Sequence, residues 1–458
     1  MAQNSPTPQT TLTSFGIGSL TCLVIASMVG SGVFTTSGFT LASLGTPFNV
    51  MLCWTIGGCI AMCGAIAYGR LATLMPQSGG EYLYLSRNVD PLAGFLVGWV
   101  SLIAGFSGAI ATAAIAFEEY AVPAHLRPAW LPPDTVAIFI VLFFGLAHGL
   151  KSQWGRSLQN VVVVVKLIAL ALFIVIAITS FQSHNWYVAG NPAAAPVGMN
   201  WFTEMASALV WISLSYLGFN AAIYVAGEST TAATIVPRAL VLGTAIVTLL
   251  YLILNLIFVT AAPYNTLAGQ APVAALSAGA IGGPWLESLI RSTVCLGLLS
   301  SISGMVMSGP RVYSRMADDE VFPTLFSLRR QGLHRSIILQ TIIAAGLILL
   351  QRVLVDAGFV ENSLLGLFDY LGTTLSLSSA CCIATLFLPT VRRRFEQSHA
   401  LSDIAAAIYV VATIVFVVLM AANKSEPGSV PGLYHLTGAA ITVITGVIAY
   451  SIFRKKNA

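Results

Sequence analysis

The sequence predicts an all-α membrane protein with twelve transmembrane helices, and three observations support this. Of the 458 residues, 57% are hydrophobic and only 8% are charged, whereas a soluble protein has about 25% charged residues. The apolar residues form blocks such as 161–178 and 239–262, which are too long for barrel strands and lack a two-residue alternation. The Lys and Arg residues gather on one side of the expected spans. Together these features exclude a large soluble domain.

The spans follow from apolar blocks separated by Gly and Pro residues, which interrupt helices. Each span needs roughly 20 mainly apolar residues, and the chain has enough of them for twelve helices with short connections. The expected ranges are 14–40, 48–74, 90–120, 134–150, 156–181, 201–227, 237–262, 284–316, 335–355, 363–389, 402–422 and 434–453. Residues 1–14 contain no Lys or Arg and no cleavage signal follows them, so we expect a retained first helix instead of a signal peptide.

The basic residues predict the orientation. Sixteen of the 21 Lys and Arg residues fall on the side of the N-terminus, four fall on the opposite side, and Lys166 lies within a span. An even number of spans puts both termini on one side, and the positive-inside rule makes that side the cytoplasm. We expect a multi-pass protein of the plasma or inner membrane, with the lipid bilayer as its partner. The net charge of +4 has the same origin, and no basic stripe with interleaved aromatics suggests a nucleic-acid partner.

All seven cysteines fall inside expected spans, away from loops where an oxidising compartment could pair them. Cys59 and Cys63 lie one helical turn apart, but small polarizable residues are also common on a packing face. We therefore expect no disulfide, no metal site and no cofactor. The sequence contains no GxSxG or HExxH motif, which would indicate an enzyme, and no pattern of like charges that would indicate the pore of a channel.

Two spans carry signs of a broken helix. In the first, Gly30 and Gly32 stand on either side of Ser31 near mid-membrane. Two glycines so close cost about 2 kcal/mol of helix propensity, which an ordinary span would avoid. In the sixth span, Gly218 and Asn220 lie near the middle. The sequence thus predicts two breaks, five helices apart.

Broken helices at corresponding positions of two halves indicate the binding site of a transporter. The N–H groups that start the second half of span one suit a carboxylate. The carbonyls that end the first halves of spans one and six suit an ammonium group. Together they predict a site for an α-amino acid zwitterion. The alternative is that the glycines only permit close helix packing, as we expect for Gly94, Gly98 and Gly105 of span three.

Four strings in order resemble the amino acid–polyamine–organocation (APC) permeases, most of all the L-amino-acid transporter branch and its bacterial relatives. They are Met-Val-Gly-Ser-Gly-Val-Phe at 28–34, Pro-Gln-Ser-Gly-Gly-Glu-Tyr-Leu-Tyr-Leu at 76–85, Tyr-Leu-Gly-Phe-Asn at 216–220 and the string at 308–323. The resemblance implies a five-plus-five inverted repeat of the LeuT type, alternating access, and two extra C-terminal helices. The expected parts are a tail at 1–13, repeats at 14–181 and 201–389, spans eleven and twelve at 402–453, and a tail at 454–458.

The resemblance also implies roles for individual residues. It assigns Gly30, Ser31 and Gly32 to the substrate carboxylate, and carbonyls near Ile25 and Tyr216, beside Gly218, to the amino group. The residues that would face the substrate side chain are Ser27, Ser101, Gly105, Leu214, Phe219, Asn220 and the span-eight serines Ser300, Ser301 and Ser303. Members often have an aromatic gate where this chain has Leu214, so the residue that closes the outer path stays open.

Lys166 lies about ten residues, roughly 15 Å, inside span five. A lysine there costs about 2.5–3.5 kcal/mol and needs a partner or a function. One reading is that its long stem snorkels to the interface. The other is that its ammonium bridges span one to span eight near Ser300, Ser301 and Ser303. By the resemblance it replaces a sodium ion, which implies sodium independence.

Tyr251 and Asn255 lie one turn apart on span seven. In the resembling family, a tyrosine here helps the lysine to close the inner gate. The alternative is that both residues only form hydrogen bonds between helices.

The pocket strings contain no carboxylate, which favours neutral amino acids over cationic ones. Asp369 on span ten is the exception, and we expect it to be a solvated end cap instead of a pocket residue. Exchange, proton symport and cationic antiport remain open. We expect a monomer or weak homo-oligomer without a covalent heavy-chain subunit, because residues 118–133 contain no cysteine.

Overall fold

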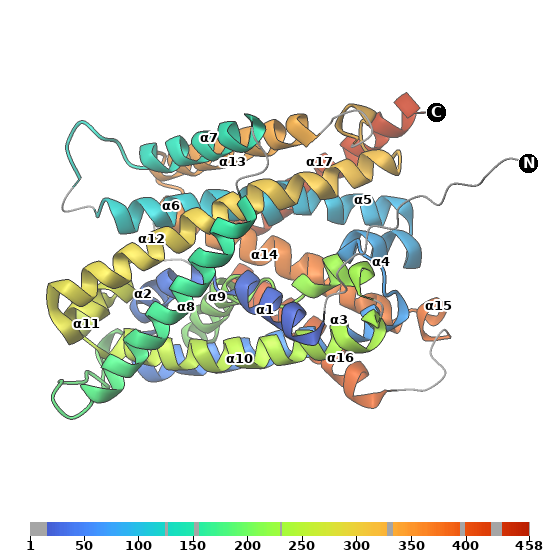
Figure 1. The fold of residues 1–458 in the computed structure, drawn as a ribbon. Coiled ribbons are helices and arrows are strands. Elements are labelled where there is room, and N and C mark those ends of the chain that lie inside the picture. Colours follow the sequence, from blue (N-terminus) through green and yellow to red (C-terminus); the bar gives the residue numbers. More distant parts are fainter. Residues whose placement is uncertain are drawn as a thin grey trace, which may run out of the picture.

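The computed structural model describes residues 16–123, 127–150, 155–229, 231–327, 333–393, 399–422 and 433–457. Every regular element within these ranges is a helix, so the all-α prediction is confirmed (Figure 1). The expected N-terminal tail at 1–13 lies outside the described residues. The expected C-terminal tail is not a separate segment, because helix α17 continues as far as Asn457.

The α-helices coincide closely with the apolar blocks of the sequence. Their bounds are α1 Ile17–Met28, α2 Gly32–Leu44, α3 Pro47–Leu74, α4 Gly80–Asn88, α5 Pro91–Val100, α6 Ala109–Ala121, α7 Thr135–Leu150, α8 Gly155–Thr179, α9 Met199–Ser215, α10 Ala232–Thr260, α11 Tyr264–Leu267, α12 Val273–Asp318, α13 Leu333–Asp356, α14 Ser363–Ala384, α15 Pro389–Arg392, α16 Ala400–Ala421 and α17 Leu433–Asn457. Within α12, Gly282 and Gly283 are not helical, so the expected eighth span begins after a kink.

Eight helices of the described chain are long and apolar enough to cross a membrane, or nine if the bent pair α1 and α2 is one span. Three further expected spans, in α7, α8 and α9, are not among these helices. Helices α7 and α8 supply shorter apolar stretches, Thr135–Gly149 and Val164–Thr179, and α9 is interrupted after Ser215. The multi-pass architecture is therefore present, and the number twelve stays a prediction.

Most long helices run along a common direction, and α8 crosses them obliquely (Figure 1). Helix α10 packs on α3 and α1, α12 packs on α6 and α8, and α14 packs on α9 and α16. Helix α4, α15 and the end of α17 lie at one end of the bundle, whereas α11 and the connection between α6 and α7 lie at the other (Figure 1).

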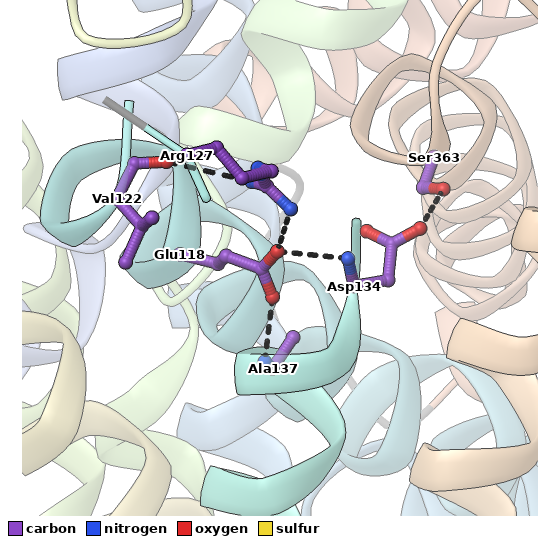
Figure 2. Close-up of polar contacts among 6 residues, drawn as sticks. All are labelled: Glu118, Val122, Arg127, Asp134, Ala137 and Ser363. Atoms are coloured by element: carbon purple, nitrogen blue, oxygen red, sulfur yellow. Dashed lines mark hydrogen bonds and ion pairs between the residues drawn. The ribbon is translucent and has the colours of Figure 1, made fainter. Parts of the chain in front are cut away.

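At the second of these ends, Glu118 joins α6 to α7 (Figure 2). Its carboxylate pairs with the Arg127 guanidinium and accepts 2.8 Å hydrogen bonds from the backbone N–H groups of Asp134 and Ala137. These N–H groups lie at the start of α7, where the helix dipole favours a negative charge. The Asp134 carboxylate accepts a 2.6 Å hydrogen bond from Ser363, which starts α14. The cluster thus fixes three helix ends relative to one another.

Candidate functional site

The first span is broken where the glycines predict. Helix α1 ends at Met28 and α2 begins at Gly32, and the two halves are bent by 43°. Among the described residues, no hydrogen bond runs from the N–H groups of Ser31, Gly32 and Val33 to an acceptor. These free donors stand at the N-terminus of α2, where the helix dipole favours an anion.

The second break lies next to Gly218, as expected, but its far side differs from the expectation. Helix α9 ends at Ser215, residues 216–220 form turns, and Ala221–Glu228 forms a 3₁₀-helix, η4. Gly218 has φ +101°, a conformation that favours glycine. The continuation of span six is therefore a 3₁₀-helix and not a second α-helical half.

The two breaks touch each other. A Cβ atom on Gly218 would lie 2.7 Å from the carbonyl oxygen of Ser27, and one on Gly32 would lie 2.7 Å from the Cα of Ser215. Because both contacts involve backbone atoms, only glycine permits this approach at either position. The hydroxyls of Thr36 and Ser215 add a 3.0 Å hydrogen bond between α2 and α9. Two gaps far apart in the sequence thus form one irregular region.

Tyr251 and Lys166 satisfy carbonyls at this region. The Tyr251 hydroxyl donates to Met28 O at 2.6 Å and lies 3.1 Å from Ser215 O, the last carbonyls of α1 and α9. The Lys166 ammonium is buried and donates to Val29 O at 2.6 Å. The lysine therefore does not snorkel in this structure.

On span eight, Lys166 meets Gly297 instead of the expected serines. A Cβ on Gly297 would come within 2.9 Å of the lysine Cδ. The Ser301 hydroxyl donates to the Gly297 carbonyl, and Ser303 turns to His148 on α7, 2.9 Å away. Ser300 is half-buried. The small residue at 297 leaves room for the lysine stem, which is why the contact lies one turn earlier than predicted.

Asn255 has a packing role between α10 and α2. Its amide donates to the Tyr251 carbonyl at 2.8 Å, and its side-chain oxygen accepts from Ser37. Trp54 of α3 donates to the same serine at 2.9 Å. Asn255 thus supports the position of Tyr251 without contact with either break.

The other predicted site residues differ in how far their side chains are exposed and in whether they pack against other helices. Ser27 is exposed, and the half-buried residues are Ile25, Gly30, Ser31, Ser101, Gly105, Leu214, Gly218 and Asn220. Ile25 O already accepts the Val29 N–H at 3.1 Å, and Tyr216 is buried against Trp54 and Tyr251. The Phe219 ring packs between Tyr68 and Tyr409. Its ring therefore contacts α3 and α16 and lines a cavity beside the second break.

Asp369 is not a solvated end cap. It is buried, and its Oδ1 accepts a 2.6 Å hydrogen bond from the indole of Trp211 on α9. Trp211 lies one turn before Leu214 and is the aromatic residue nearest to it on that helix. The presence of Trp211 in this stretch is the sequence signal from which a partner for Asp369 could have been predicted.

The sequence did not predict two further features of this region. Ser101 and Gly105 belong to a π-helix, Ser101–Gly108, in the middle of span three, and π-helical turns often occur at functional sites. Glu81, at the start of α4, is buried and accepts a hydrogen bond from Asn220 at 3.2 Å. The sequence signal for Glu81 is an acidic residue within the string at 76–85.

A small cavity of about 30 Å³ adjoins the second break on its α16 side, away from the contact between the two breaks. It is lined mainly by apolar residues of α3, α9 and α16 and by Tyr216, Leu217 and Phe219 of the second break. Ser376 of α14 completes the lining, and its hydroxyl lies 2.9 Å from that of Ser213. This cavity therefore does not coincide with the free donors of Ser31, Gly32 and Val33.

A bundle of apolar helices with two adjoining mid-helix breaks has the architecture of secondary transporters. A family model described as "Amino acid permease" matches residues 15–450. The chain therefore belongs to the amino acid permease family.

Several proteins are similar to the chain at low identity. The large neutral amino acids transporter small subunit 2 of Oryctolagus cuniculus is 24% identical over 325 residues, 68% of this chain and 59% of that protein. The Asc-type amino acid transporter 1 of Homo sapiens is 24% identical over 323 residues, 68% and 60% respectively. The serine/threonine exchanger SteT of Bacillus subtilis is 28% identical over 323 residues, 69% and 70%. The chain thus spans about three-fifths of the length of the first two relatives.

Proposed function

We propose that the protein is a sodium-independent exchanger of neutral L-amino acids, a permease and not an enzyme. The observation that carries this proposal is the contact of two broken helices beside unpaired N–H donors. The relatives named as a large neutral amino acids transporter and as a serine/threonine exchanger support the substrate class and the exchange mode.

In this proposal the N–H groups of Ser31, Gly32 and Val33 bind the substrate carboxylate. The amino group binds near the carbonyls at the end of α1 and beside Tyr216. Since Met28 O and Val29 O are held by Tyr251 and Lys166, the amino group must share or displace one of these contacts. Substrate binding would thereby act directly on the two residues that hold the first break.

Lys166 supports the absence of a sodium requirement. Its ammonium is a fixed positive charge at a carbonyl beside the first break, and carbonyls at such breaks are typical sodium ligands. A sodium ion at the same carbonyl would be repelled by the lysine.

The finer architecture belongs to the same proposal. We place twelve spans in an inverted repeat, 14–181 and 201–389, with 402–453 outside it and both termini in the cytoplasm of a cell membrane. The rabbit relative is named as a small subunit, but we propose no covalent partner here because residues 118–133 contain no cysteine. The protein would be a monomer or a weak homo-oligomer.

Uptake into proteoliposomes tests the function. With internal unlabelled serine, uptake of labelled L-serine should saturate, should be faster than into empty vesicles, and should be equal in sodium and choline buffers. A strict sodium requirement, or uptake that does not saturate, contradicts the proposal. Stronger competition by arginine or agmatine than by alanine, serine or leucine would contradict the neutral substrate class.

A further inference from the structure

Glu81 is a buried carboxylate at the end of the bundle that carries α4. The residue is 6% exposed. One of its oxygens, Oε1, accepts hydrogen bonds from three different elements: Tyr68 of α3, Ser379 of α14 at 2.9 Å, and Asn220 beside the second break at 3.2 Å. Glu81 itself belongs to α4, which leads into α5 of span three. A single oxygen atom thus connects four separate parts of the chain.

The local backbone is shaped to bring Glu81 to this place. Gly80 has φ +57°, and a Cβ atom there would overlap the ring of Tyr224 on η4. The Ser78 hydroxyl accepts a 3.0 Å hydrogen bond from the Gly227 N–H, also on η4. The turn before α4 is therefore docked on the 3₁₀-helix that follows the second break, so a movement of that break must move Glu81 or detach it.

Among the residues that the structure describes, no cation forms an ion pair or hydrogen bond with Glu81. Its hydrogen-bond donors are a phenol, a hydroxyl and an amide. The other ionisable groups that face it are the phenols of Tyr84 on α4, Tyr224 on η4 and Tyr409 on α16, and the thiols of Cys381 and Cys382 on α14. On the α12 side of α4, Tyr82 donates to Asp319 at 3.2 Å. None of these groups offers a positive charge to balance the carboxylate.

An ionised carboxylate is costly to bury without a cation, and protonation removes that cost. Burial raises the pKa of Glu81, and the hydrogen bonds from Tyr68, Ser379 and Asn220 lower it only in part. The buried site thus favours uptake of a proton by Glu81, while the three donors favour the ionised form.

We propose that Glu81 binds a proton during the transport cycle and that its ionised form locks α4 to the second break. This inference rests on the proposed function and adds the proton as a second ligand. The ionised carboxylate accepts three charge-assisted hydrogen bonds, which are about twice as strong as neutral ones. When a proton from solution forms an O–H bond on the other oxygen, Oε2, the charge is lost and Asn220 is held less tightly. The proton returns to solution when the lock forms again.

The pH dependence of exchange tests this proposal. The rate of serine exchange, measured at equal pH on both sides between about pH 5 and about pH 9, should rise at least threefold, about half a decade, as the pH falls. Glu81→Gln, which resembles the protonated form, should exchange at nearly the low-pH rate throughout. Glu287→Gln, an acidic residue in a partly exposed pair with Arg291, is the matched control and should keep the wild-type profile. A flat wild-type profile, or an unchanged profile in an active Glu81→Gln variant, overturns the proposal.

Tyr68→Phe covers the case in which Glu81→Gln does not fold. Loss of one donor to the charged form raises the pKa of Glu81, so the midpoint of the rate profile should move to higher pH. A purely structural role of Tyr68 would change the rate and leave the midpoint in place, and that result also overturns the proposal.

Thermal unfolding in detergent separates this inference from the proposed function, because it needs no substrate. A carboxyl whose pKa is raised in the folded state stabilises that state at low pH, and the stabilisation is lost as the pH rises through the folded value. The apparent Tm of the wild type relative to Glu81→Gln should therefore fall with rising pH. A constant difference overturns the proton site even if exchange is normal. A falling difference without any amino acid exchange contradicts the proposed function alone.

Discussion

Two buried glutamates at opposite ends of the bundle each accept three hydrogen bonds, yet their partners differ in kind. Glu118 is paired with the Arg127 guanidinium and with two backbone N–H groups at the start of α7. Glu81 has only neutral side-chain donors. In the first cluster the negative charge is balanced by a cation and a helix dipole. In the second it is balanced only by hydrogen bonds, which a proton can weaken.

The difference matches what each cluster holds. The Glu118 cluster joins the ends of α6, α7 and α14 (Figure 2), where no helix is broken. The Glu81 cluster joins α4 to α3, α14 and the second break. An Arg–Glu ion pair therefore lies where we expect rigidity, and a carboxylate without a cation partner among the described residues lies where the backbone is irregular and can rearrange.

The largest effect is expected from Arg127→Ala. This change leaves the Glu118 carboxylate buried beside no guanidinium, and breaking a buried pair typically costs about 3–5 kcal/mol. Thermal unfolding in detergent should show a strongly lowered Tm, while the protein that stays folded keeps the wild-type pH profile of exchange. An unchanged Tm would show that the ion pair of the Glu118 cluster does not stabilise the protein, and the contrast with the Glu81 cluster would no longer hold.

The second largest effect is expected from Lys166→Ala. The rate of amino acid exchange should fall at least about tenfold, which corresponds to 1.4 kcal/mol. The reason is that Val29 O at the first break loses the hydrogen bond that the Lys166 ammonium donates to it. Arg352→Ala, in an exposed pair with Asp356, is the control and should exchange normally. If turnover in Lys166→Ala equals the wild type, the lysine is a packing residue and not part of the transport site.

Ser379→Ala tests whether hydrogen bonds stabilise the ionised form of Glu81. It removes the 2.9 Å hydrogen bond to Oε1, and a hydrogen bond to a charged group is worth about 1.5 kcal/mol or more. The midpoint of the pH profile should therefore move about one pH unit upward, as measured by serine exchange. A shift to lower pH would mean that the hydroxyl donates to the neutral form instead.

The smallest effect is expected from Glu287→Gln. Glu287 and Arg291 form a partly exposed pair four residues apart, and such pairs contribute about 0.3–0.5 kcal/mol. The Tm should change little. A large loss of Tm here would show that cation pairing stabilises this protein wherever it occurs, so the Glu118 cluster would no longer be distinctive.

Much of this structure could be predicted from local patterns, because long apolar blocks and closely spaced glycines are recognised from residues that are near one another in the sequence. The break at 29–31 and the buried lysine follow from the cost of glycine and of charge within a span. The bond from Lys166 to Val29 O brings together residues 137 positions apart, so its partner could be expected only from a family resemblance.

The rest depends on contacts that no local pattern contains. Glu81 joins residues 13, 139 and 298 positions away, and nothing near it in the sequence marks it as buried. The position of the lysine stem was misjudged because the free space at Gly297 arises from helix packing. The burial of Asp369 was not predicted, because its hydrogen-bond partner, the Trp211 indole, lies on another helix and is not evident from the sequence around Asp369. The π-helix in span three has no simple sequence rule at all.

We infer that the touching breaks at 29–31 and 216–220 form the amino acid site. An experimental density map of the protein with saturating L-serine tests this assignment. We expect density between the breaks, with the carboxylate within hydrogen-bond distance of the N–H groups of Ser31, Gly32 and Val33. Serine bound instead in the cavity on the α16 side of the second break, with no density at the N–H groups of Ser31, Gly32 and Val33, would contradict this assignment.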